Sequence, residues 1–150
     1  MLSFSMRKDR IERLIRKVDR ATCPTHPLLV EIVSAVCPRH LEGRGSKSVA
    51  LRHWLETDAY HDVIFGLVEW ELPGWTVRRL ALDDGLWWCA LTPRLSAFWG
   101  HDEVDESHPD MTLALAKAFL VALCRDPVER PPVAARSSNL GVDDARALWW

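Results

Sequence analysis

The chain has 150 residues, of which 48% are hydrophobic and 27% charged, and its formal net charge at pH 7 is −2. This length and balance predict one globular domain with its own core and exclude an intrinsically disordered chain. The near-neutral charge gives no overall attraction to nucleic acid or to anionic membranes. The apolar runs are too short to span a bilayer.

The chain starts without the apolar stretch of a secretory signal, so we expect a cytoplasmic protein. Its four cysteines are scattered along the sequence, at Cys23, Cys37, Cys89 and Cys124. Disulfide frameworks belong to small secreted chains, and this chain is large enough to fold without them. We therefore expect reduced thiols.

Residues 7–22 are predicted to form an amphipathic helix, because their apolar residues recur at helical spacing: Ile11, Leu14, Ile15 and Val18. Residues 1–22 contain seven Lys or Arg and three Asp or Glu. One interpretation is a surface for an acidic partner or a phosphate backbone. The alternative is a solvated face with ordinary pairs one turn apart, such as Glu12 with Arg16.

A second, mostly buried helix is predicted between Thr25, which can cap it, and Pro38, which ends it. Its β-branched residues leave a strand open as an alternative. Residues 41–48 are predicted to be a flexible connector. A further helix is predicted over 57–71, ended by Leu72-Pro73-Gly74-Trp75.

A β-hairpin is the clearest local prediction, with strands at Trp75–Leu82 and Leu86–Thr92 around the loop Asp83-Asp84-Gly85. We expect Leu82 to face Leu86, which pairs Leu80 with Trp88 and Ala81 with Trp87. Both faces of this ribbon then carry large apolar side chains. The hairpin should therefore be covered, at least in part, on both sides.

Residues 93–100 are predicted to add a third short strand, followed by an acidic loop over 101–110. An apolar helix is predicted over 108–124, with Ser107 and Asp110 as a capping box. Residues 126–141 lack periodicity, and the chain ends in an apolar stretch. These features predict a single domain over 1–125 and a flexible tail over 126–150.

The fold class expected from this order is α+β, with a Trp-rich antiparallel hairpin packed by helices in a layered sandwich. The order of elements resembles the small phage and prophage proteins that have a phage ABA sandwich domain. The resemblance covers residues 10–124. It is carried by Arg10–Ala21 leading into Thr22-Cys23-Pro24, the helix running into Leu72-Pro73-Gly74-Trp75, the two Trp-rich strands, and Thr112-Leu-Ala-Leu-Ala-Lys-Ala118. It implies a phage-associated context and supplies no catalytic residues.

Two Cys-x-x-His pairs, Cys23/His26 and Cys37/His40, offer the sulfur and nitrogen ligands that zinc prefers. A helix between the pairs would hold them about 15 Å apart, too far for one ion. Only a strand or loop there would bring them together. A zinc-binding protein using these four residues is therefore kept as an alternative function.

Two other clusters contain residue types found in enzyme sites. The acidic stretch, with His101 and His108 at its ends, can be interpreted as the metal site of a hydrolase or as a solvated helix-capping loop. The second cluster consists of His53, Asp58, His61 and Asp62, in which a carboxylate can orient a histidine as a base. No nucleophile or phosphate-binding motif accompanies it. We therefore expect no catalysis, no cofactor and no bound metal.

The function expected is that of a non-enzymatic, phage- or prophage-encoded accessory protein that acts by contact with a host or phage protein. An acidic face that imitates nucleic acid would let it inhibit a host defence complex, as anti-CRISPR proteins do. Direct contact with nucleic acid or membrane is not favoured. Most of the eight tryptophans are assigned to the core. The predicted binding residues lie in the acidic stretch and at the C-terminus: Asp102, Glu103, Asp105, Glu106, Leu148, Trp149 and Trp150.

Overall fold

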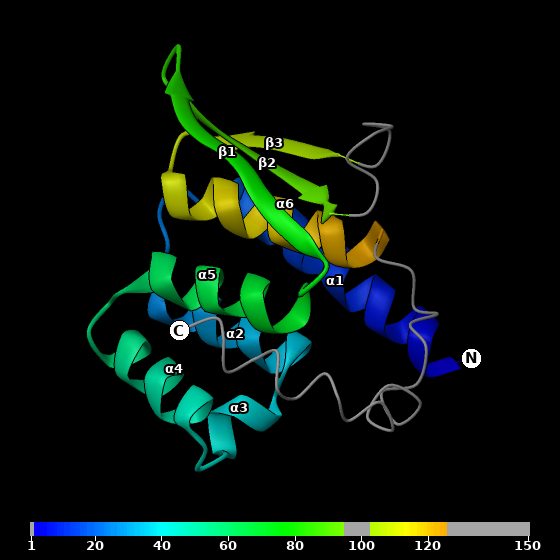
Figure 1. Cartoon of the computed structure of the whole chain (residues 1–150), viewed down its shortest axis with the longest axis vertical. Helices are drawn as coiled ribbons and strands as arrows, with labels where there is room; N and C mark the ends of the chain where they lie inside the picture. Colours follow the sequence, from blue (N-terminus) through cyan, green and yellow to red (C-terminus); the bar gives the residue numbers. More distant parts are fainter. Residues whose placement is uncertain (1, 95–102, 126–150) are drawn as a thin grey trace, which may run out of the picture.

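The computed structural model describes residues 2–94 and 103–125. In chain order the elements are α1 (Leu2–Arg20), α2 (His26–Val36), α3 (Arg39–Glu42), α4 (Ser46–Glu56), α5 (Tyr60–Glu71), β1 (Trp75–Asp83), β2 (Leu86–Pro93), β3 (Val104–His108) and α6 (Met111–Arg125). The expected α+β class, with an antiparallel sheet packed by helices, is confirmed (Figure 1).

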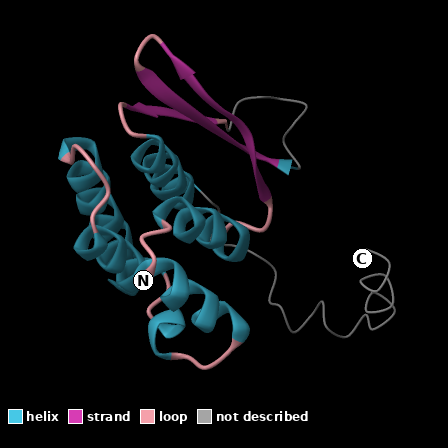
Figure 2. Cartoon of the chain, turned by 90° about the vertical axis from the view of Figure 1, so that its left-hand side faces the viewer, coloured by secondary structure: helices cyan, strands magenta, loops and turns pink. Residues whose placement is uncertain are grey.

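The three strands form one antiparallel sheet in the order β1-β2-β3, and α6 lies directly against it. Helices α6, α1, α2 and α5 each pack against the next, so that α6 separates the sheet from α1 (Figure 2). The core fills this arrangement, and its largest fully buried side chains include Phe119, Leu29 and Ile32. Helices α3 and α4 form an arm that packs on α2 and α5.

The predicted helix over 25–38 is confirmed as α2, and the strand alternative is wrong. Thr25 caps it by accepting a hydrogen bond from the backbone N–H of Leu28 at 3.3 Å. The connector predicted over 41–48 is wrong, because α3 and the start of α4 occupy it and leave only Gly43–Gly45 between them. The helix predicted from residue 57 begins at Tyr60. Thr57 instead ends α4, and its hydroxyl donates to the carbonyl of His53 at 2.9 Å.

The hairpin is confirmed, but its predicted register is wrong by one residue. Asp83 faces Leu86, which pairs Leu80 with Cys89 and Ala81 with Trp88. The loop therefore has two residues rather than three. Asp84 and Gly85 both have positive φ angles, of 53° and 80°, as a type I′ turn requires.

The acidic stretch, predicted as a loop, contains the third strand. β3 pairs with β2, and it lies beyond the predicted strand over 93–100, most of which falls outside the described residues. The last helix begins at Met111 rather than residue 108. Asp110 itself caps it, since its Oδ1 accepts from the backbone N–H of Leu113 at 3.0 Å. The predicted capping box with Ser107 is therefore wrong.

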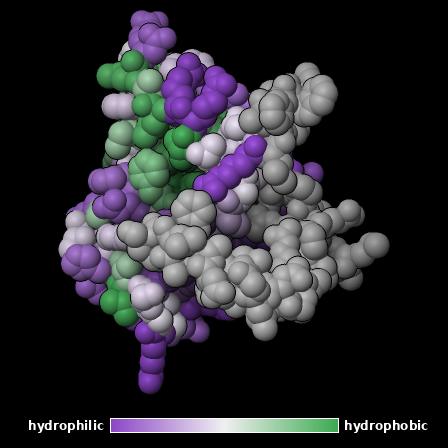
Figure 3. All heavy atoms as spheres, in the orientation of Figure 1, coloured by the Kyte–Doolittle hydropathy of each residue, from purple (hydrophilic) through white to green (hydrophobic). Residues whose placement is uncertain are grey.

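Among the described residues, helices cover one face of the sheet only, and side chains give the other face partial cover (Figure 2). Cys89 and Leu91 belong to the core, which places Trp88 and Ala90 on the opposite face. Near the hairpin turn Leu82 is 59% exposed. Figure 3 shows hydrophobic side chains beside hydrophilic ones over this part of the molecule.

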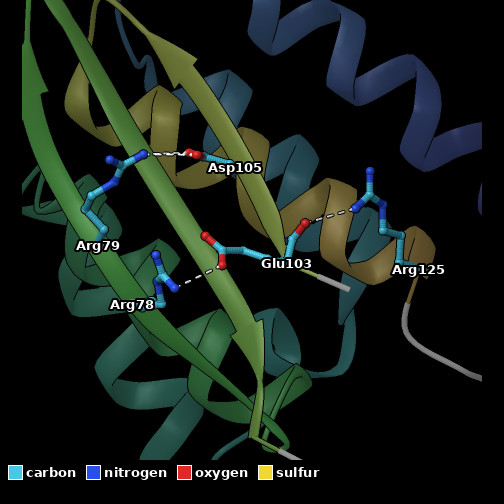
Figure 4. A network of polar contacts seen from close by, with 5 residues as sticks. All are labelled: Arg78, Arg79, Glu103, Asp105 and Arg125. Atoms are coloured by element: carbon cyan, nitrogen blue, oxygen red, sulfur yellow. Dashed lines mark hydrogen bonds and ion pairs between the residues drawn. The ribbon is translucent and has the colours of Figure 1, made fainter. Parts of the chain in front are cut away.

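A bulge in β1 places two arginines over the face of the sheet opposite the helices. The register shifts between Val77 and Arg79, which places two arginines opposite the short side chain of Ala90. Both reach across β2 to acids near β3: Arg78 to Glu103 at 3.2 Å and Arg79 to Asp105 at 2.9 Å (Figure 4). Ala90 is fully buried although none of the described helices covers it.

Candidate metal centre

Cys37, His40 and Glu71 converge where three helices meet. One ligand atom from each, Sγ of Cys37, a ring nitrogen of His40 and a carboxylate oxygen of Glu71, lies within 4.8 Å of the other two. Cys37 directly follows α2, His40 lies in α3 and Glu71 ends α5. Glu71 is 34 residues from Cys37 and 31 from His40 along the chain, so only the packing of α5 against α2 brings it to the other two.

The turn Cys37-Pro38-Arg39-His40 holds the first two ligands together. Pro38 cannot continue α2, and it begins α3 as the N-cap residue. The backbone N–H of His40 then donates to the carbonyl of Cys37 at 3.1 Å. This local hydrogen bond directs a thiol and an imidazole, three residues apart, to the same side of the turn.

The helix ends create an electrostatic preference for a cation. Helices α2 and α5 both terminate at this centre, and the C-terminal end of a helix carries a partial negative charge. Neither helix has a basic residue in its last turn. Glu71 adds a full negative charge where the helix dipole alone would disfavour one. A bound cation would be stabilised by all three contributions.

The thiol of Cys37 is not an activated nucleophile. Its side chain is buried, and burial, followed by the nearby Glu71 carboxylate, raises the pKa of Cys37 to about 12. Arg39 and Arg7 oppose this rise more weakly. Because nucleophilic cysteines need a lowered pKa, the arrangement does not support covalent catalysis. A metal ion, in contrast, can displace the thiol proton.

Aromatic side chains enclose the centre on the side of the arm. The ring of His40 lies edge-on to Trp70, with 5.2 Å between centroids, and Trp54 stacks on Trp70 at 5.9 Å. Lys47 Nζ lies 5.8 Å from the centroid of Trp70. The imidazole of His40 is therefore held in place by a packed aromatic neighbour.

The four-residue zinc site considered from the sequence does not form. α2 lies between Cys23/His26 and Cys37/His40, and a helix of 11 residues holds its two ends about 15 Å apart. Only the second pair takes part, and its partner is Glu71. Sequence reasoning missed Glu71, whose one signal was its place immediately before the helix-ending Leu72-Pro73-Gly74.

The predicted binding residues of the acidic stretch that the structure describes are all engaged with cations. Glu103 and Asp105 pair with Arg78 and Arg79, and Glu106 lies 3.6 Å from Lys117. Binding by these residues stays a prediction, although their negative charge is largely compensated. Asp102, His101, Leu148, Trp149 and Trp150 lie outside the described residues.

His108 is a structural residue. It is 4% exposed; its Nδ1 accepts from the backbone N–H of Asp110 and its Nε2 lies 2.9 Å from the carbonyl of Ala21. Both nitrogens are thus occupied, which leaves neither for a metal or a substrate proton. In the other predicted cluster His61 lies 3.7 Å from Asp62, too far for a hydrogen bond, and both side chains are about half exposed.

The chain matches no protein-family model, no curated protein and no solved structure. The resemblance to the phage ABA sandwich proteins therefore stays a prediction. All four cysteines are free. Among the described residues, none of the helices combines the length and the apolar character needed to cross a bilayer.

Proposed function

We propose that the protein binds a zinc-class divalent ion through Cys37, His40 and Glu71. The observation that carries this proposal is the convergence of a thiol, an imidazole and a carboxylate to within 4.8 Å of one another. Thiolate and imidazole ligands favour zinc, whereas magnesium and calcium take oxygen ligands. Three protein ligands leave one position of a tetrahedral ion for water or another ligand.

The ligand atoms need only a small movement to enclose the ion. Bonds of about 2.0–2.3 Å to tetrahedral zinc place neighbouring ligand atoms roughly 3.5 Å apart. The three atoms lie within 4.8 Å of one another. Side-chain adjustments of about 1 Å therefore suffice. An ion in this position would join α2, α3 and α5, and so attach the α3–α4 arm to the rest of the molecule.

The experiment is a zinc titration against a chromophoric chelator of known affinity, with the metal content of the purified protein measured in parallel. We expect one equivalent of zinc, and a loss of at least about 100-fold in affinity for Cys37→Ser and for Glu71→Gln. Cys23→Ser and His26→Gln are matched controls from the other end of α2 and should bind as the unchanged protein does. Equal loss in Cys37→Ser and Cys23→Ser, or no competition with the chelator, refutes the proposal.

Action by protein contact in a phage context is a separate proposal. The predicted acidic face has less free negative charge with which to imitate nucleic acid, because Glu103, Asp105 and Glu106 form ion pairs within the protein. If this face does bind a basic partner, the affinity must fall steeply as salt is raised. Affinity that is the same at low and high salt would exclude mimicry.

A further inference from the structure

The outer face of α1 is a strip of arginines that have no acidic partner in the described part of the chain. Ile11, Leu14 and Val18 turn inward and are buried. The opposite side of the helix carries four exposed arginines, here called the α1 basic face: Arg10, Arg13, Arg16 and Arg20. At 1.5 Å per residue this face is about 15 Å long.

These arginines are not explained by pairing within the protein. Across residues 2–94 and 103–125, no carboxylate oxygen lies within 4.0 Å of any of the four guanidinium groups. The pair expected between Glu12 and Arg16 is not formed. Two lysines nearby do have partners: Lys17 of α1 contacts Glu31 at 2.7 Å, and Lys117 contacts Asp19 of α1 at 2.7 Å. The four arginines differ from these two lysines in this respect.

Helix stability explains only Arg20. That residue lies in the last turn of α1, where the helix dipole favours a cation, and the other three lie outside the terminal turns, where the dipole has little effect. Like charges three or four residues apart on a helix repel each other, as Arg10 with Arg13 and Arg16 with Arg20 do. Among the described residues no ion pair compensates this repulsion, which leaves all four guanidinium groups available to an external partner.

We infer that the α1 basic face binds the phosphate backbone of nucleic acid without reading its sequence. Arginine is suited to phosphate because its planar group donates two parallel hydrogen bonds. A membrane surface fits less well, since a helix that lies in a bilayer needs free apolar side chains, and Ile11, Leu14 and Val18 are buried in the core. This inference is independent of the metal centre. It assigns a partner to a basic segment that the overall charge of −2 does not show.

The test is the fluorescence anisotropy of a labelled 20-base-pair DNA duplex, titrated with the full chain between 50 and 200 mM salt. With three or four phosphate contacts, log affinity should fall against log salt with a slope of about −3, which is roughly a 60-fold loss over this range. A triple variant, Arg10→Gln, Arg13→Gln and Arg16→Gln, should lose most of this slope and bind at least about tenfold more weakly at 50 mM salt.

The matched control removes the same charge from exposed positions of the arm, through Arg39→Gln, Arg44→Gln and Lys47→Gln. It should bind within about threefold of the unchanged protein. Equal loss in both triple variants would show an effect of net charge alone and overturn the inference. No binding at 50 mM salt would also overturn it, as would binding to phosphatidylglycerol vesicles or polyglutamate but not to the duplex.

Discussion

Gly66 of α5 lies at the contact with α4, and a substitution at this position tests how the two helices pack. A Cβ at residue 66 would lie 2.8 Å from Cζ3 of Trp54 and 3.3 Å from Cη2 of Trp70. Ordinary carbon–carbon contacts are about 3.5–4.0 Å, so Gly66→Ala must push the Trp54 ring away from α5. The stack of Trp54 on Trp70 would be disturbed by the same movement.

Two opposing effects set the size of the change. Alanine inside a helix is more stable than glycine by about 1 kcal/mol. Overpacking a filled contact typically costs about 1–3 kcal/mol. In the unchanged protein we therefore expect Gly66→Ala to lower the free energy of unfolding by about 1 kcal/mol. In a Trp54→Ala background the obstructing ring is gone, and the same substitution should raise it by up to about 1 kcal/mol.

The assay is urea denaturation of the four proteins of this double-mutant cycle, followed by circular dichroism. The predicted reversal of sign corresponds to a coupling of about 2 kcal/mol, well above the roughly 0.5 kcal/mol within which independent sites are additive. If Gly66→Ala changes stability equally in both backgrounds, Trp54 does not rest on Gly66 and the docking of the arm described above is wrong.

Three further predictions follow from buried or paired groups. Because the pKa of Cys37 is about 12, zinc binding near pH 7 should release about one proton from the thiol, and affinity should rise about tenfold per pH unit; calorimetry in two buffers of different ionisation enthalpy checks this. His108→Ala removes the ring nitrogens that pair with two backbone groups, and it should lower the free energy of unfolding by about 2–3 kcal/mol, measured with urea. A loss under about 0.5 kcal/mol would contradict the assigned role. A hydrogen bond from Lys117 and its charge lower the pKa of Asp19 from 3.8, so this pair stabilises the fold above pH 3.8 and stops doing so as pH falls through the lower value. Since Asp19 is largely exposed, Asp19→Asn should remove less than about 1 kcal/mol of acid-dependent stability, seen as a flatter unfolding curve against pH, and an unchanged curve would contradict the pairing.

Local patterns predicted the elements whose signals are strong and short in range. The spacing of Ile11, Leu14 and Val18 identified α1, the capping residue Thr25 identified α2, and the acidic-glycine turn identified the hairpin. α4 was missed, because the glycines before it suggested a connector. β3 was missed because its side chains are mostly polar, and its hydrogen bonds to β2 stabilise it as a strand.

By itself the sequence determined the α+β class, the pairing of the two Trp-rich strands, and the presence of a thiol and an imidazole three residues apart in a turn. These are properties of neighbours along the chain, so periodicity and turn chemistry are enough to specify them. Only the tertiary structure decided that Glu71 completes the cluster, that the acids near β3 pair with Arg78 and Arg79, and that four arginines of α1 have no acidic partner among the described residues. Those outcomes depend on how helices and strands distant in sequence pack, and packing is a sum of many small long-range contacts that no local pattern encodes.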